Sequence, residues 1–590
     1  RLDETFEHWD RKALVDEVVS ILRDEEPHMI IARFHGAERD GHGNHQAAGV
    51  IAKEAFQRLT AVSKLFVSTR PGEASTHSVR TGDYDPLVGM TWRDLGTLGY
   101  RQHRTQGMGG IPGLRGGPDS TLRLIESRVP DNPNDLRSGI TAPGSAGNAL
   151  EMFDARQPWR SVPALVQALR SASTKRQRAL LEEAIARALC LRLDAFVAGS
   201  QPVPGQRFTA KVSLAYEGRA EGTTRLVAPD GWPVDGLNVT VPADAKPGPA
   251  SVFVEASLRV EGTEVRVRRP VEYQTVHPVD GPQRSALEVL PVLSLSVWPE
   301  VALRPAGVSQ HSVHVTARAN APCSGEVRLA GQSVPLRFLA AGEVFTREFT
   351  TGSQLVNIEA ACGTSRAEVQ QKVVISDVQI PSGLRIGYVQ GAGDQTAAML
   401  RHAGVQVHDL TAEDLATGDL SRYQAILVGV RASAVRPEWK AHRTRLLDYA
   451  ERGGNIVIQY QTEEFDDAPF GPFPYKLTAR SEEVSEEKAP VQILKADHRI
   501  FHRPNVVDAD AFAGWIEQRG SKWMTEWDPR YEALLESHDR GQAPQKGGLL
   551  VARTGKGHWS YAAYAFYRQL PAGVPGAWKL LVNLLSLGVV

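Results

Sequence analysis

Two histidines three residues apart, His42 and His45, are the side chains in this sequence best suited to chemistry. An apolar stretch of strand length, residues 29–32, precedes them, and apolar residues recur at helical spacing over residues 48–59. This pattern predicts that His45 lies in the first turn of a helix and His42 in the loop before it. Imidazole is the commonest metal ligand in proteins, and α/β folds place their sites at the carboxyl ends of strands. The pair is therefore a candidate metal site, although two histidines at this spacing also occur as hydrogen-bonded loop residues.

The elements around the pair predict a parallel sheet covered by helices. Residues 14–22 carry an amphipathic stripe, residues 29–32 and 65–68 are typical of strands, and a helix lies between these two strands. Arg33 and Asp40 fall in the loop at the carboxyl end of the first strand. There they could line a cleft, although each alone is also typical of a solvated loop.

A second group of polar residues precedes a loop rich in glycine and proline. His103, Arg104 and Gln106 stand at the start of this loop, which continues to Ser120. They could surround a polar substrate pocket, or they could satisfy backbone groups of the loop. No Gly-Lys-Ser/Thr sequence follows, so a phosphate loop is not predicted.

Both groups occur in segments that resemble the PIG-L/LmbE-like zinc-dependent deacetylases. Residues 27–49 are similar to the family's second motif, a strand leading to a His-x-x-His pair, and residues 82–87 and 100–109 look like the YDPL and HRSQGMG segments of its large members. The resemblance implies that His45 is a ligand of a catalytic Zn²⁺ and that His42 stabilises the tetrahedral intermediate of amide hydrolysis. It also implies an N-acetylated amino sugar or glycoconjugate as the substrate.

The same family places its other zinc ligands and its general base in an earlier strand that ends in Ala-His-Pro-Asp-Asp. No His-Pro-Asp-Asp occurs in these 590 residues, which begin on a segment resembling the middle of the domain. Three explanations stay open: a cut, earlier residues that are not in this sequence, or an incomplete site. Under the first two, the upstream segment of the same protein is a partner. The third favours a non-catalytic cell-envelope scaffold or glycan-binding protein built on a degenerate deacetylase domain.

Composition excludes some other classes of protein. Lys+Arg 67 against Asp+Glu 68 leaves almost no net charge, so no nucleic-acid partner is expected. The longest apolar runs fall short of the roughly 18 residues that a membrane helix needs, so no membrane span is expected. We expect a secreted or envelope-associated protein. Cys323 and Cys362 lie in one β-rich stretch and could pair after export, whereas Cys190 falls on a helical pattern and is expected to be a small buried residue.

The length of 590 residues predicts several domains. Residues 1–199 are expected to form the truncated Rossmann-like α/β deacetylase domain, including two helices over residues 164–197. Strict alternation from Phe208 to Tyr216, and again after residue 293, predicts two β-sandwich domains, at 200–282 and 283–379.

Residues 380–590 are predicted to form a flavodoxin-like α/β domain, because buried strands alternate with helices from residue 384 to residue 460. This layout resembles the glutamine-amidotransferase-like domains that end large PIG-L-type proteins. Those amidotransferases use a cysteine nucleophile. Residues 380–590 contain no cysteine, so we expect a binding or structural domain rather than thiol chemistry.

Overall fold

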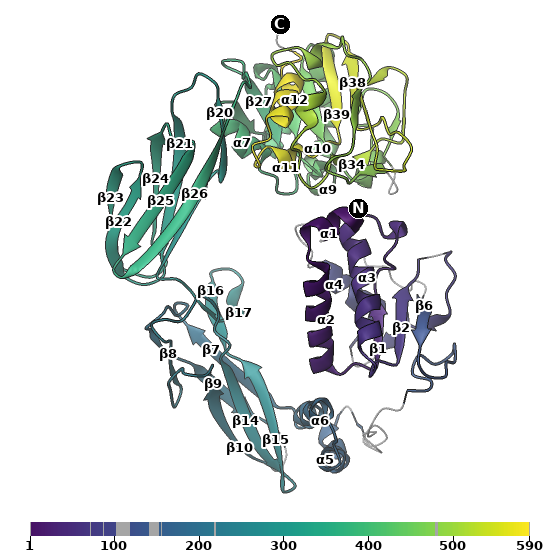
Figure 1. Ribbon diagram of the computed structural model, residues 1–590, viewed down its shortest axis with the longest axis vertical. Coiled ribbons are helices and arrows are strands. Elements are labelled where there is room, and N and C mark those ends of the chain that lie inside the picture. The colour runs from purple at the N-terminus through teal and green to yellow at the C-terminus, as the bar shows by residue number, and fades with distance from the viewer. Residues whose placement is uncertain are drawn as a thin grey trace.

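The computed structural model describes residues 2–70, 72–85, 88–101, 119–140, 153–154, 156–217, 220–477 and 482–588. Over these residues the chain is a multi-domain protein rich in short strands, which form many separate sheets, with some helices. Figure 1 shows, in chain order, an N-terminal α/β unit, a first β region, a second β region and a C-terminal α/β unit. His103, Arg104 and Gln106 lie outside the described residues, so the role predicted for them remains a prediction.

The N-terminal α/β unit contains a four-stranded sheet of order β1-β2-β6-β3. Strand β1 is parallel to β2, whereas β6 is antiparallel to both β2 and β3. Val19 of α2 and Phe56 of α3 are buried against Leu65 of β2, so these helices cover the parallel part of the sheet. The predicted strand and helix are confirmed, and the helix begins between the two histidines. The elements are α1 (Leu2–His8), α2 (Arg11–Glu25), β1 (Met29–Ala32), α3 (Gly43–Arg58), β2 (Lys64–Ser68), β3 (His77–Val79), β4 (Tyr84–Asp85), β5 (Met90–Thr91), α4 (Trp92–Tyr100) and β6 (Ser120–Ser127).

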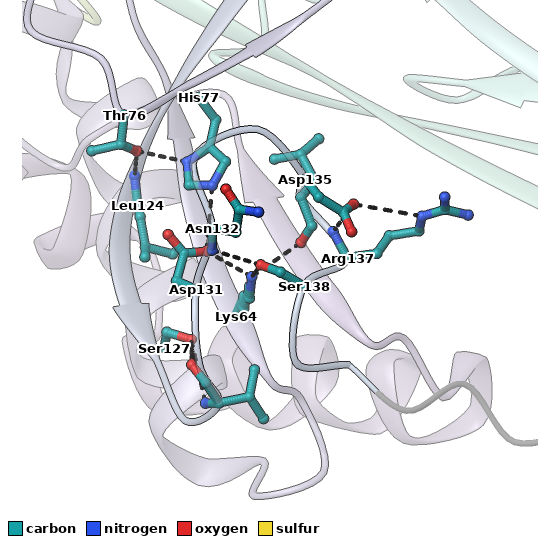
Figure 2. Close-up of polar contacts among 12 residues, drawn as sticks. Lys64, Thr76, His77, Leu124, Ser127, Asp131, Asn132, Asp135, Arg137 and Ser138 are labelled. Carbon is teal, nitrogen blue, oxygen red and sulfur yellow. Dashed lines mark hydrogen bonds and ion pairs between the residues drawn. The ribbon is translucent and has the colours of Figure 1, made fainter.

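A buried ion pair fixes the segment that follows β6 (Figure 2). Lys64, the first residue of β2, is fully buried, and its Nζ donates to Asp131 Oδ1 at 2.6 Å, Ser138 Oγ at 3.0 Å and the Leu136 carbonyl at 3.2 Å. His77 Nε2 lies 3.3 Å from the same Asp131 oxygen. Burial opposes ionisation of Asp131, but the Lys64 hydrogen bond and the electrostatic interactions with His77 and Lys64 outweigh it and lower the pKa of Asp131. A buried ammonium requires such compensation, so this cluster has a structural role.

Two helices that sequence patterning assigned to the N-terminal domain pack elsewhere. Helices α5 (Val162–Arg170) and α6 (Lys175–Ala188) share a core with the hairpin of β14 (Phe253–Val260) and β15 (Thr263–Pro270). The chain then forms β7 (Arg192–Ala198), which pairs with β9 (Lys211–Ala215) and β16 (Glu272–His277). The first β region therefore begins before residue 192 and not after residue 199, and the second predicted helix ends at Ala188 rather than at residue 197.

The first β region contains several sheets around one core. Strand β17 (Gly281–Ala286) pairs with β16 along its whole length, so the predicted boundary at residue 282 lies inside a strand of this region. The turn between β14 and β15 consists of Glu261 and Gly262, both with positive φ, which confirms the predicted hairpin. The remaining longer strands are β8 (Arg207–Thr209), β10 (Glu221–Val227) and β12 (Asn238–Thr240).

The second β region packs a three-stranded sheet, β19-β21-β24, against a five-stranded sheet, β20-β26-β25-β22-β23, around a shared apolar core. Cys323 and Cys362 lie on adjacent strands of the larger sheet and form a disulfide, with their Cα atoms 5.5 Å apart. Cys190 lies just after α6, with φ 50°, and is exposed, so the expectation of a buried residue is wrong. The strands are β19 (Leu293–Trp298), β20 (Val301–Pro305), β21 (His311–Ala319), β22 (Cys323–Leu329), β23 (Gln332–Phe338), β24 (Val344–Thr351), β25 (Leu355–Cys362) and β26 (Ser365–Ser376).

The C-terminal α/β unit contains a seven-stranded sheet of order β28-β27-β29-β30-β39-β38-β36. The first five strands in this order are parallel to one another. Strand β38 then pairs antiparallel with β39, and β36 pairs antiparallel with β38. The strands and helices predicted from residue 384 to residue 460 are confirmed within a few residues. The main elements are β27 (Arg385–Val389), α7 (Thr396–His402), β28 (Gln406–Asp409), β29 (Ala425–Val428), α10 (Pro437–Glu451), β30 (Asn455–Gln459), β34 (Gly520–Trp523), β36 (Tyr531–Ala533), β38 (Leu549–Thr554), β39 (Gly557–Ala562), α11 (Phe566–Gln569) and α12 (Pro575–Leu585).

Within the described ranges, the structure contains no helix with the length and apolar character needed to cross a membrane.

The Lys64–Asp131 pair gives a test of the N-terminal unit. Asp131→Ala is expected to destabilise this unit by about 3–5 kcal/mol, because it leaves a buried ammonium without its anion. Adding Lys64→Met should recover most of the loss, since the unpaired charge is then gone. Hydrogen exchange of the β2 and β6 amides in increasing denaturant measures both effects. Equal destabilisation by the single and double variants would contradict the structural role.

The disulfide gives a second test. With a sequence separation of 39 residues, closure of this loop is expected to add about 4 kcal/mol to stability. Because the disulfide occupies Cys323 and Cys362, protein isolated without reductant should show one reactive thiol, that of Cys190, before and after denaturation. Two additional thiols in denaturant would show that Cys323 and Cys362 are not paired.

Candidate functional site

The loop between β1 and α3 is organised by one buried carboxylate. Asp40 is 4% exposed, and its Oδ2 accepts hydrogen bonds from the backbone N–H groups of His35 at 2.8 Å, Gly36 at 2.7 Å and Ala37 at 3.1 Å. These bonds turn the chain away from β1 toward the helix. The structure therefore gives Asp40 a positioning role, and the predicted contact with substrate does not fit its burial. Arg33, the first residue after β1, is exposed.

Two glycines bring the start of α3 against this loop. Gly36 has φ +79°, and Gly49 on α3 faces it so closely that a Cβ on Gly49 would lie 2.2 Å from the Gly36 nitrogen and 2.7 Å from the His35 carbonyl carbon. No other residue type fits at Gly49 unless the helix moves away. The close approach places His42 and His45 at the carboxyl end of β1, where α/β proteins bind their ligands.

The ring of His45 is held in one orientation. It stacks on Phe34, with centroids 4.1 Å apart and 13° between the planes, and it contacts the His42 ring at 3.9 Å. Its Nδ1 lies 3.1 Å from the Asp40 carbonyl oxygen. Because a carbonyl can only accept, Nδ1 carries a proton, and Nε2 is the ring nitrogen that could present a lone pair. Metal-binding histidines are commonly oriented in this way.

His42 is the N-cap residue of α3, and its side chain makes no capping hydrogen bond. Desolvation lowers the pKa of His42, and a positive charge on His45 would act in the same direction. The structure therefore favours a neutral imidazole at this position. A neutral imidazole can still donate one hydrogen bond to a developing negative charge.

The donor set near His45 does not make a catalytic zinc site by itself. A catalytic zinc takes three protein ligands and an open position, and among the residues that the structure describes no group of three or more His, Cys, Asp or Glu side chains could hold a metal. His45 has the orientation of a ligand, but the described residues supply no second and third donor beside it.

A cavity of about 410 Å³ lies next to His42, between the N-terminal and C-terminal units. The N-terminal unit contributes residues of α1, the following Trp9, and the start of α3, and the C-terminal unit contributes residues from three separate segments. Figure 1 shows how the chain returns, so that α1 lies beside the C-terminal unit. Its lining includes Glu4, Thr5, His8, Trp9, His42, Asn44, Glu487, Glu517, Gln518 and Arg568.

Sequence reasoning found the two histidines but missed several residues around them. Gly49 belongs to the motif of residues 27–49, and a glycine on the inner face of a helix indicates that another segment packs closely against it. Phe34 gave no signal, because one aromatic residue after a strand is common. Glu487, Gln518 and Arg568 are separated from His42 by more than four hundred residues, and no local pattern connects them to it.

No family model matches this chain, and no curated protein matches it. Among solved structures, a cold-adapted β-galactosidase from a Rahnella strain is similar over 35% of this chain and 32% of its own, at 14% identity and a TM-score of 0.21. A family 123 glycoside hydrolase from Clostridium perfringens matches 29% of this chain and 38% of its own, at 10% identity and a TM-score of 0.12. A tandem pair of titin Ig domains matches 32% of this chain and 95% of its own, at 10% identity and a TM-score of 0.13. The chain thus spans about a third of the first two proteins, and these low scores carry no functional argument.

The contact between Gly49 and Gly36 can be tested with one methyl group. Gly49→Ala is expected to displace α3 from the loop, destabilise the N-terminal unit and lose the His42–His45 geometry. The matched control is Gly96→Ala on α4, where an added Cβ meets no atom within 4 Å. That control should stabilise its helix by about 0.5–1 kcal/mol. Thermal unfolding and the imidazole NMR signals measure the outcomes, and equal behaviour of the two variants would contradict the close packing.

Proposed function

We propose that this protein is most of a zinc-dependent N-deacetylase that hydrolyses the amide of an N-acetylated amino sugar or glycoconjugate. The observation that carries the proposal is the orientation of His45. Its ring stacks on Phe34 and contacts the tilted ring of His42, and its Nδ1 lies 3.1 Å from the Asp40 carbonyl oxygen, so Nε2 is available to a metal. The resemblance of residues 27–49 to the LmbE-like motif adds the reaction class.

The proposal also assigns a domain type to each part of the chain. The N-terminal unit would be the later part of an LmbE-like, Rossmann-like domain. The two β regions would be β-sandwich domains. The C-terminal unit, with its parallel order 2-1-3-4-5, would be a flavodoxin-like domain related to glutamine amidotransferases but without a cysteine nucleophile. The disulfide supports a secreted or envelope location, because disulfides persist in oxidising compartments.

The proposal assigns different work to the two histidines. His45 would donate Nε2 to the metal, and His42 would donate a hydrogen bond to the oxyanion that forms on the acetyl carbonyl. Zinc supplies a Lewis acid and a water of lowered pKa when it is bound at such sites. The remaining ligands and the general base would come from residues outside those that the structure describes, including an upstream segment of the same protein.

The alternative is a non-catalytic envelope scaffold or glycan-binding protein. One observation favours it: the described residues contain no cluster of three metal-ligating side chains. The alternative keeps sugar binding but predicts neither stoichiometric zinc nor acetate release.

Three histidine variants of the full protein, including any upstream segment, separate the two functions. His45→Ala should lose both zinc and acetate release from N-acetylglucosamine, because it removes a ligand. His42→Ala should retain most of the zinc and lose about 10²–10³-fold in kcat, because it removes an oxyanion donor. His28→Ala is the control, since His28 is exposed at the opposite end of β1, and it should resemble the unmodified protein.

Metal analysis and an acetate assay measure these effects. Full zinc content in His45→Ala, or protein without zinc and without activity, would overturn the deacetylase proposal and favour the scaffold.

A further inference from the structure

In both α/β units, residues that follow the carboxyl ends of parallel strands line the cavity. In the N-terminal unit, the carboxyl end of β1 leads to the loop and to His42. In the C-terminal unit, β30 and β39 are parallel, and their carboxyl ends lead to Tyr460 and to α11 with Tyr567 and Arg568. The rings of Tyr460 and Tyr567 lie 5.9 Å apart and connect these two ends. Open α/β sheets bind ligands at this edge, so each unit offers its ligand-binding edge to the same space.

Direct contacts hold the two units together beside that space. The backbone N–H of Glu487 donates to Glu4 Oε1 at 3.0 Å, and His8 Nε2 lies 3.9 Å from Glu487 Oε2. Thr5 Oγ1 donates to Asn44 Oδ1 at 3.1 Å, which ties α1 to the first turn of α3. The cavity of about 410 Å³ is therefore framed by bonded elements from both units. Its volume lies within the roughly 300–1,000 Å³ of small-molecule sites, which often occur between domains.

The wall formed by the C-terminal unit is ordered before any ligand binds. Gln518 Nε2 donates to the Tyr567 hydroxyl at 3.1 Å, and Arg568 Nε donates to the same hydroxyl at 3.3 Å. Arg568 also pairs with Glu517. Glu517 has φ 62°, an uncommon conformation for a residue other than glycine, and its N–H donates to Glu487 Oε1 at 2.6 Å. Such preorganisation reduces the entropy that binding would otherwise lose.

The chemistry of the lining favours a neutral polyol over an anion. The charge of Arg568 is matched by Glu517, while Glu4 and Glu487 add carboxylate acceptors and Asn44 and Gln518 add amide groups. Carboxylate and amide side chains suit the adjacent hydroxyl groups of a sugar, which both donate and accept. Trp9, 39% exposed at the rim, offers a flat apolar face with a polar edge.

We propose that this cavity is a sugar-binding subsite shared by the two α/β units. It would hold the sugar ring that is linked to the N-acetylated ring at His42, with Gln518 and Trp9 as its main contacts. The C-terminal unit would then set the preference for an oligosaccharide over a monosaccharide. The inference rests on the proposed function for the position of the acetamide at His42, whereas sugar binding in the cavity does not require turnover.

Calorimetric titration of the full protein with N-acetylglucosamine and with its β-1,4-linked disaccharide tests the subsite. The unmodified protein should bind the disaccharide more tightly. Gln518→Ala and Trp9→Ala, which alter lining residues from different units, should each reduce the ratio of disaccharide to monosaccharide affinity about tenfold, which corresponds to ~1.4 kcal/mol. The controls are Gln283→Ala on β17 and Trp159→Ala, which remove the same side-chain types at exposed positions that do not line the cavity, and they should leave the ratio unchanged.

The outcomes separate this inference from the proposed function. Selective loss of disaccharide affinity in both variants supports the subsite even if no acetate is released. Acetate release with the same disaccharide KM in both variants as in the unmodified protein overturns the subsite while the deacetylase stands. Equal affinity of the unmodified protein for the two sugars, or no binding of either, also overturns it.

Discussion

The carboxylate of Asp40 organises the candidate site. A buried carboxylate is stable when hydrogen-bond donors surround it, and here three consecutive backbone N–H groups do so. The same residue uses its backbone carbonyl to hold the Nδ1 proton of His45. One residue thus sets both the path of the loop and the face that the imidazole presents. The glycine contact between Gly36 and Gly49 then brings the helix close enough for this to happen.

The parts of the fold that could be predicted are those in which local pattern and tertiary structure agree. Strand β1 and helix α3 carry clear periodicities, and so do the alternating elements of the C-terminal unit, so their bounds differ from the predicted ones by a few residues at most. Strand β7 shows the opposite case. Leucine, alanine and arginine favour helix in residues 191–198, yet pairing with β9 and β16 makes this segment a strand. The pairing partners lie elsewhere in the sequence, so the local pattern predicted the wrong element.

The candidate site likewise has a part that the local sequence predicts and a part that it does not. The order of residues around His42 and His45 was enough to place His45 in the first turn of a helix and His42 just before it, after a strand. It was not enough to assign Asp40, because a carboxylate in a loop has the same local signature whether it contacts a ligand or the backbone. Burial distinguishes the two, and burial depends on how α3 packs. The wall formed by Gln518 and Arg568 depends on the return of the chain over its whole length, which no window of sequence contains.

The chain brings its first unit back beside its last unit, and this connection affects the strength of the contact between them. Because one polypeptide joins them, their encounter is intramolecular, and the folded β regions between them set the effective concentration at which they meet. A contact made of a few polar bonds, such as that between Glu4 and Glu487, would be too weak to join separate molecules at ordinary cellular concentrations. Joined through one chain, the same contact forms without the loss of translational and rotational freedom that association of separate molecules requires.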